Sequence, residues 1–301
     1  VLKVFGNKEQ AGVECDYVIA KHGFDQPLPP TAQAELTSIV QAGERSIGGE
    51  RRDLSDLPFV TIDSTRTLDI DDALFAETTG SGWQLYVAIA DPTELIPAGS
   101  ELDRALLERA VSLYLPGEVV PMIPPELTHD VCALAEGESR PALVCRITVA
   151  DSGAIEGYEF FEALVRSGAK LSYIAVDRYV TGSSDDLMAH ASPLEALYQS
   201  YRALRSHRED HELVMEDRAD YRLMLGEDGK IERIEPQEKL QSQKLVEECM
   251  VAANRCAADF LARNACPGPF VVHRGFREDR LKQARSEEHT SELQSPDHLV
   301  C

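Results

Sequence analysis

Four aspartates lie within ten residues of this chain: Asp63, Asp69, Asp71 and Asp72. Carboxylates this close together repel one another unless a cation lies among them. Hard oxygen ligands of this kind favour Mg²⁺ or Mn²⁺ over zinc. A pair of such ions, about 3.5–4 Å apart, can activate water and neutralise charge on a phosphate. The pattern therefore predicts a metal site, and the alternative is a solvated acidic loop.

The segments on both sides of the aspartates favour the metal site. Residues 57–62 are mostly apolar, which is typical of a buried strand, and residues 73–76 are again apolar. An acidic run between two buried strands is rarely plain surface. We therefore expect Asp63 at the end of a strand and the other three aspartates on the loop that returns from it.

This stretch resembles the signature of the ribonuclease II (RNB) family, through RDLSDLPFVTID at residues 52–63 and DIDDA at residues 69–73. The resemblance continues in the same order in residues 87–93, 114–117, 121–124, 140–143, 169–173, 246–248 and 272–276. It implies a Mg²⁺-dependent exoribonuclease, with Mn²⁺ as the alternative ion, that degrades single-stranded RNA from the 3′ end to 5′-nucleotides. The AIADPT segment is more similar to the bacterial ribonuclease II branch than to ribonuclease R.

The resemblance assigns roles to the acidic cluster. It implies that Asp63, Asp69, Asp71 and Asp72 are all catalytic. It also implies that Asp63, Asp69 and Asp72 are metal ligands, with Asp63 and Asp72 as the principal pair. Asp71 and Asp72 point in different directions, so one can hold a metal while the other contacts the reacting RNA terminus.

The resemblance further implies that Tyr114, Tyr173, Met215 and Glu247 contact the substrate. Tyr114 would stack on the 3′-terminal base, and a ring face accepts any base. Met215 stands where ribonuclease II has a base-stacking phenylalanine, and it offers dispersion contacts without a flat platform. The alternatives are core aromatics for the two tyrosines and an exposed helix acid for Glu247. We interpret His273 as a structural residue at a strand end.

The composition limits the interpretation. The chain has 30 Lys and Arg against 52 Asp and Glu, a net charge of −22, although RNA binding normally needs a basic surface. This charge predicts weak RNA affinity for the chain by itself.

No apolar run approaches the roughly 18 residues that a membrane helix needs. The seven cysteines contain no Cys-x-x-Cys pair, which favours reduced core thiols in a cytoplasmic protein over zinc or disulfides.

Four segments are expected. Residues 1–26, with a strand over 13–20, would be the remnant of a cold-shock OB-fold, and residues 27–50 a linker with a short helix. Residues 51–284 would be the RNB catalytic domain, incomplete on its C-terminal side. Residues 285–301 read like a translated sequencing adapter, so we interpret them as a non-native tail, with a genuine polar terminus as the alternative.

The fold class expected for the catalytic domain is α+β, a mixed sheet with helices. Periodicity and turn residues predict strands over 83–90, 143–149 and 159–165, a hairpin around 228–229, a helix capped by Ser100, and a long helix over 239–265.

The leading functional hypothesis is a ribonuclease II-type exoribonuclease of RNA catabolism, with single-stranded RNA as its partner and no membrane association. A monomer is the expected state. The alternative is a catalytically inactive RNA-binding or interaction fragment, because the family's later phosphate-gripping arginines and C-terminal OB-fold are absent from this chain. A metal-dependent phosphodiesterase with another substrate is a third hypothesis.

Overall fold

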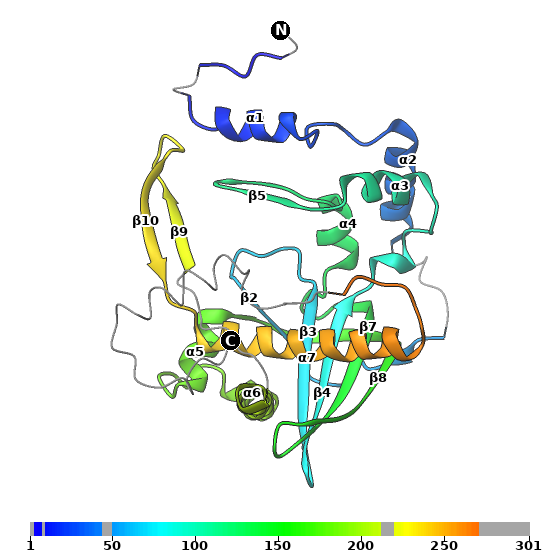
Figure 1. Ribbon diagram of the computed structural model, residues 1–301, viewed down its shortest axis with the longest axis vertical. Helices are drawn as coiled ribbons and strands as arrows, with labels where there is room; N and C mark the ends of the chain where they lie inside the picture. The colour runs from blue at the N-terminus through cyan, green and yellow to red at the C-terminus, as the bar shows by residue number, and fades with distance from the viewer. Residues whose placement is uncertain (1–2, 8–9, 44–49, 212–219, 271–301) are drawn as a thin grey trace, which may run out of the picture.

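The computed structural model describes residues 3–7, 10–43, 50–211 and 220–270. Helices and short hairpins form an upper layer in Figure 1, and a large twisted sheet with three helices forms the lower part. This arrangement confirms the α+β fold class with a mixed sheet. No helix in the described part of the chain is both long and apolar enough to cross a membrane.

The main sheet has six strands. In chain order they are β1 (Arg52–Asp53), β2 (Phe59–Asp63), β3 (Asp72–Thr79), β4 (Gly82–Ala90), β7 (Ser139–Ala150) and β8 (Ile155–Ser172). Their hydrogen-bonded order is β1-β8-β2-β3-β4-β7, and β8 also pairs with β7. The long β8 pairs antiparallel with β7 through residues 155–166 and parallel with β2 through residues 167–172. The pairing therefore closes into a ring of five strands, with β1 added outside.

Alternating side chains give the sheet two apolar faces. Val60 and Leu74 belong to one buried cluster, whereas Phe59 and Phe75 belong to a second. Because neighbouring residues of a strand point to opposite faces, this alternation explains why the strands are apolar throughout their length. The strands predicted over 57–62, 83–90, 143–149 and 159–165 are all confirmed.

A tight turn joins the two longest strands. Gly153 has φ +81°, and a Cβ there would lie 1.9 Å from the carbonyl oxygen of Ala203 in the helix beneath. Only glycine fits both the left-handed backbone and this close approach. The turn therefore fixes the β7–β8 hairpin against that helix.

Three helices cover one face of the sheet: α5 (Tyr173–Val180), α6 (Ala191–His211) and α7 (Gln241–Arg263). Figure 1 shows α7 lying across the strands. Leu194 and Leu197 of α6 and Leu245 and Cys249 of α7 are fully buried against the sheet. The long helix predicted over 239–265 is thus confirmed, and its apolar spacing is explained by this packing.

The upper layer contains short elements. They are η2 (Pro92–Glu94), α3 (Glu101–Arg109), β5 (Leu113–Leu115), β6 (Glu118–Val120), α4 (Pro125–Leu127), the π-helical turn η3 (Thr128–Cys132) and α2 (Pro30–Ala42). Ser100 Oγ accepts a hydrogen bond from the Asp103 amide at 3.1 Å, which confirms the predicted helix cap. Ala32 and Leu36 of α2 are buried against α3 and α4. The helix expected within residues 27–50 therefore exists, and it packs into a small core of its own.

The strand predicted over residues 13–20 is wrong. These residues form helix α1 (Val13–Lys21), and the described residues among 3–26 contain no strand. Glu14 and Asp16 in its first turn and Lys21 in its last turn complement the helix dipole. A helix also satisfies its own backbone, whereas a strand without neighbours leaves its polar groups unpaired. An OB-fold remnant is therefore not seen in this segment.

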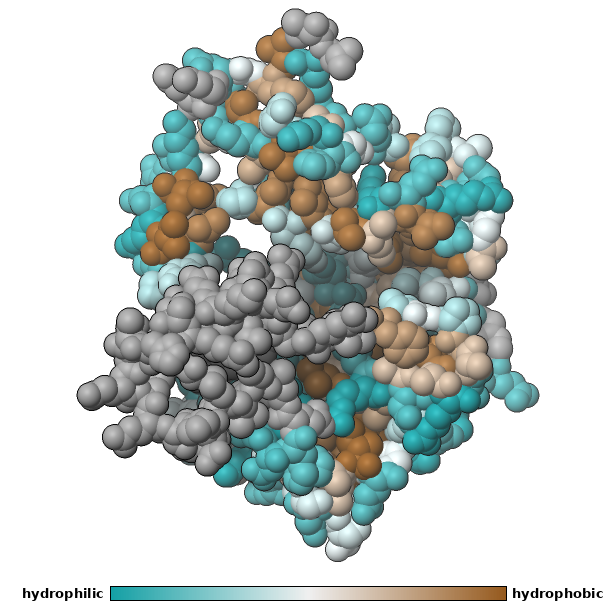
Figure 2. Space-filling view, viewed as in Figure 1, coloured by the Kyte–Doolittle hydropathy of each residue, from teal (hydrophilic) through white to brown (hydrophobic). Residues whose placement is uncertain are grey.

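A second hairpin stands beside the main body. It comprises β9 (Asp220–Leu225) and β10 (Ile231–Gln237), around the predicted turn at residues 228–229. Figure 2 shows apolar side chains gathered over this hairpin, where Tyr221, Ile231 and Ile234 are exposed. The remaining element in the described part of the chain is the short 3-10 helix η4 (Met188–His190).

Candidate active site

The strand ends of the main sheet bring the acidic loop together with the start of α5. Asp63 is the last residue of β2 and lies opposite Ser172 of the parallel strand β8. Tyr173 follows Ser172 as the first residue of α5. Asp72, which was expected on the loop, is instead the first residue of β3, so the loop spans residues 64–71. Parallel pairing of β2 and β8 therefore sets Asp63 beside the entrance to α5.

The loop is fixed by backbone bonds near its far end. Ile70 is buried, and its carbonyl oxygen accepts from the Leu134 amide at 2.9 Å. The Asp71 carbonyl oxygen accepts from the Ala90 amide at 2.8 Å. Because these anchors come from two other segments, the aspartates on either side of Ile70 have defined positions.

Asp63 is held by polar groups of its own loop. Its Oδ1 accepts from the Ser64 amide at 2.8 Å and from Thr67 Oγ1 at 2.9 Å. The Ser64 and Thr67 hydroxyls are also within 2.8 Å of each other. The carboxylate is thus oriented by neutral donors while its negative charge is left without an ion-pair partner among the described residues.

Asp72 carries the least satisfied carboxylate of the cluster. Its Oδ2 is buried and has no hydrogen-bond partner in the part of the chain that the structure describes. Burial, together with the negative charges of Asp63 and then Asp71, raises the pKa of Asp72 to about 6. Burial also raises the pKa of Asp71, with added contributions from Asp69 and Asp63. The four carboxylates therefore form one electrostatically connected group.

The donor chemistry fits a hard divalent cation, although the grouping is looser than expected. Carboxylate oxygens are the ligands that Mg²⁺ prefers, and a buried oxygen without a partner suits a cation. However, no set of three or more His, Cys, Asp or Glu side chains is close enough to hold a metal ion within the described ranges. The predicted ligand set of Asp63, Asp69 and Asp72 is therefore not assembled, and the Asp63–Asp72 pair is the part that fits.

Of the predicted substrate residues that the structure describes, Tyr173 is the one that lies with the aspartates. Burial, together with the charges of Asp63 and then Asp72, raises the pKa of its phenol to about 12. Its backbone carbonyl accepts from Ser242 Oγ of α7 at 2.8 Å. The tyrosine is therefore neutral at ordinary pH and is fixed between α5 and α7.

Tyr114 and Glu247, the other two predicted substrate residues that the structure describes, lie elsewhere. Tyr114 is on β5 in the upper layer, and 71% of its surface is exposed. It is therefore not the core aromatic of the alternative interpretation. Glu247 is exposed on α7 and forms an ion pair with Lys239. Met215 and His273 lie outside the described residues.

Sequence reasoning missed two cations near the acidic loop. Lys170 of β8 donates through Nζ to the carbonyl oxygen of Thr67. Arg51 has a side chain only 2% exposed and binds Asp91 at 2.9 Å and Glu94 at 2.6 Å. Lys170 is the only charged residue in the segment at 169–173, which is the one signal that could have drawn attention to it.

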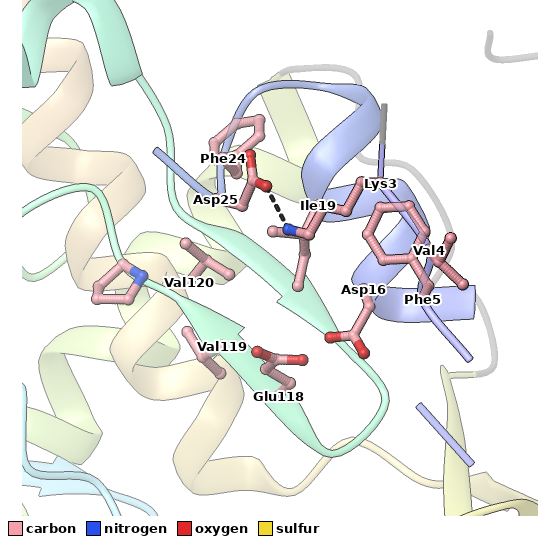
Figure 3. A pocket seen from close by; sticks show the side chains of 11 residues that line it. Lys3, Val4, Phe5, Asp16, Ile19, Phe24, Asp25, Glu118, Val119 and Val120 are labelled. Carbon is pink, nitrogen blue, oxygen red and sulfur yellow. Dashed lines mark hydrogen bonds and ion pairs between the residues drawn. The ribbon is translucent and has the colours of Figure 1, made fainter. Parts of the chain in front are cut away.

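A separate hollow of about 580 Å³ lies between the N-terminal segment and the β5–β6 hairpin. Figure 3 shows Phe5, Ile19 and Phe24 on one side and Val119 on the other, with the Lys3–Asp25 ion pair at its rim. None of the four aspartates lines it. The acidic loop, and not this hollow, is therefore the candidate active site.

Comparison with known proteins agrees with the geometry. Residues 51–299 match the family model of the RNB domain. The chain belongs to the RNB family. This RNB chain is 42% identical over 263 residues to Exoribonuclease 2 of Klebsiella pneumoniae, covering 86% of this chain and 40% of that protein. It thus spans about two fifths of the length of that curated relative.

Two solved structures share the fold. Mycoplasma genitalium RNase R in complex with ribose methylated single-stranded RNA superposes with a TM-score of 0.88 at 25% identity, over 98% of this chain and 47% of that chain. Yeast Ssd1, a pseudonuclease, superposes with a TM-score of 0.63 at 17% identity, over 87% of this chain and 33% of that chain. The likeness to Ssd1 concerns the fold alone.

Proposed function

We propose that this chain is the catalytic part of a Mg²⁺-dependent exoribonuclease that hydrolyses single-stranded RNA from the 3′ end and releases 5′-nucleotides. The observation that carries the proposal is the connected group of Asp63, Asp69, Asp71 and Asp72 at the end of β2 and the start of β3. The relatives named Exoribonuclease 2 and the RNA-bound RNase R support RNA as the substrate.

We assign a separate role to each residue of the acidic site. Asp63 and Asp72 would hold Mg²⁺, with Mn²⁺ as a substitute, and Asp69 would join them if the loop closes further. The ion, when bound, supplies charge neutralisation at the scissile phosphate and a more acidic water. Asp71 has an exposed surface, although the protein around it raises its pKa, and it would contact the reacting RNA terminus. Tyr173, neutral and fixed beside both ligands, would position that terminus.

The exposed ring of Tyr114 would stack on a base farther from the reacting bond. Glu247 would contact the substrate only after giving up its ion pair with Lys239. Met215 keeps its proposed role as a base contact. We further propose a cytoplasmic location, which the cysteine pattern favours, and a monomeric state.

The decisive experiment is digestion of RNA labelled at its 3′ or 5′ end by the chain extended to the length of its relatives. We expect mononucleotides from 3′-labelled RNA at the earliest time points and progressive shortening of 5′-labelled RNA. EDTA should stop the reaction, and added Mg²⁺ should restore it. Internal cleavage products, or digestion that persists in EDTA, would contradict the proposal.

The second candidate function is an inactive RNA-binding or interaction module. For the chain alone, the net charge of −22 favours an interaction module over an enzyme, because it disfavours tight binding of RNA phosphates. A gel-shift and exonuclease assay of residues 1–301 beside the extended protein, at equal salt, separates the two. Binding without digestion by both proteins would favour the module, and digestion by the extended protein would favour the enzyme.

A further inference from the structure

We propose that Lys170 is a positioning residue of the acidic site, which orients Asp63 by holding Thr67 in place. The inference rests on the proposed function, because Asp63 matters most as a metal ligand. Lys170 Nζ donates to the Thr67 carbonyl oxygen, and the Thr67 hydroxyl donates to Asp63 Oδ1 at 2.9 Å. The contact joins residues 103 positions apart in the sequence.

The register of the sheet explains how Lys170 reaches the loop. Lys170 of β8 lies opposite Thr61 of β2, two residues before the Asp63–Ser172 pair. Its backbone amide donates to Glu136 at 2.9 Å, so the main chain at this position is fixed independently of the side chain. The ammonium group can therefore serve the loop without also maintaining the strand.

The contact is better suited to orientation than to neutralisation. The ammonium group of Lys170 contacts the loop at Thr67, yet it forms no ion pair with an acidic side chain among the described residues. It binds a neutral carbonyl oxygen, and the negative charge of Asp63 stays available to a cation. An ion pair at the same place would compete with the metal.

Partners of metal ligands are energetically important. Removal of a group that orients a ligand typically weakens metal binding about 10–100-fold. We therefore expect Thr67→Val, which removes the hydroxyl that donates to Asp63, to weaken Mn²⁺ binding about tenfold. Lys170→Met keeps the aliphatic stem but removes the donor, and we expect a similar loss. Lys170→Arg, which retains a cationic donor, should recover most of the affinity.

The test measures Mn²⁺ binding to the chain by electron paramagnetic resonance, together with circular dichroism to check the fold. Lys230→Met is the matched control, because Lys230 is exposed in the β9–β10 turn. Thr67→Ser is the control for the hydroxyl. If Lys170 acts through Thr67, the double variant Lys170→Met/Thr67→Val should lose about tenfold in affinity and not a hundredfold.

Each outcome decides a separate point. Mn²⁺ affinity of Lys170→Met equal to that of Lys230→Met, or strictly additive losses in the double variant, would overturn the positioning role alone. Failure of the unaltered chain to bind Mn²⁺ would overturn the proposed metal site and this inference with it. If Lys170→Met does not fold, the other three variants decide. Thr67→Val should then bind Mn²⁺ more weakly than Thr67→Ser and Lys170→Arg, and equal affinities in all three would reject the inference.

A second readout is independent of metal affinity. In the extended protein with saturating Mg²⁺, loss of orientation should lower kcat severalfold while KM for RNA stays within about twofold. A purely structural role of Lys170 would change thermal stability and would leave kcat unchanged at temperatures well below unfolding.

Discussion

Two acidic regions lie at the same end of the sheet, and they differ in whether a cation of the described residues neutralises their carboxylates. Asp91 and Glu94 share the nearly buried Arg51 guanidinium, at 2.9 and 2.6 Å. Among the described residues, the nearby carboxylates of Asp71 and Asp72 have no such cation. The Asp71 carbonyl oxygen nevertheless accepts a hydrogen bond from the amide of Ala90, the residue before Asp91. Burial alone would raise the pKa of Asp91, but bonds from Thr93 and Arg51 lower it; the pKa of Asp72 is raised to about 6.

The contrast shows that the fold can neutralise carboxylates where it needs to. An arginine placed beside Asp72 would remove the cost of the unpaired charge, as Arg51 does next to Asp91. The acidic loop keeps that cost. Unpaired charge in a native structure is usually retained for function, so the loop is better explained by a ligand than by stability.

The largest expected effect is the loss of hydrolysis in Asp71→Asn. In the extended protein we expect kcat to fall by more than about 100-fold, because asparagine keeps the shape and removes the charge needed in the transition state. RNA binding, measured by gel shift, should change little. Asp186→Asn is the control, since Asp186 is exposed and distant in sequence from the loop. Cleavage within threefold of the unaltered enzyme would exclude Asp71 from the chemistry.

The next effect is on stability at the neutralised region. Arg51→Met leaves Asp91 and Glu94 charged and largely buried, which should cost about 3 kcal/mol in the free energy of unfolding. Urea titration of the chain measures this, with Arg222→Met as the exposed control. A loss under 1 kcal/mol would mean that water reaches the two carboxylates and that the two regions differ less in the cost of their buried charges.

Without metal, Asp72→Asn should increase the free energy of unfolding, whereas Arg51→Met should decrease it. A pKa of about 6 in the folded chain, against an ordinary value near 3.9, means that the folded state holds the proton more tightly than the unfolded state. Stability therefore falls as pH rises from about 4 to 6, and the cost is complete above pH 6. Asp72→Asn should be more stable by on the order of 2 kcal/mol at pH 7.5 and equal near pH 4.

Unfolding at several pH values, in EDTA, checks this prediction. The matched comparison is Asp91→Asn, which should destabilise the chain at pH 7.5, because the lowered pKa of Asp91 stabilises the fold above its unfolded pKa. If Asp72→Asn were also destabilising at pH 7.5, the carboxylate would have an internal partner that favours its charged form.

Bound metal should offset the loss of stability that the charge of Asp72 causes. A ligand that binds only the folded chain at ten times its Kd adds about 1.4 kcal/mol, so millimolar Mg²⁺ or Mn²⁺ should raise the Tm by a few degrees. The shift should shrink in Asp63→Asn/Asp72→Asn. It should also weaken below about pH 6, because protons compete for Asp72. An equal shift in the double variant would place the ion elsewhere.

The sequence predicted the strands and the long helix because their apolar spacing is set by burial on two faces of one sheet. It failed over residues 13–20, where valine, tyrosine and isoleucine favour a strand by composition, but the described residues offer no neighbouring strand to pair with. It located the aspartates and Tyr173 through local motifs. It could not find the Lys170–Thr67 contact or the Arg51 network, because such long-range partners depend on strand register.

The smallest expected effect concerns Glu247, which the family resemblance assigns to the substrate and the structure pairs with Lys239. Glu247 is about half exposed, and exposed ion pairs contribute little, so Glu247→Gln should change the free energy of unfolding by less than about 0.5 kcal/mol. A loss of RNA affinity in this variant would then report a lost contact and not a damaged fold. Lys239→Gln is the control: it frees Glu247, so it should leave RNA affinity unchanged or raise it if Glu247 binds substrate. Equal losses in both variants would show that the ion pair itself supports the site.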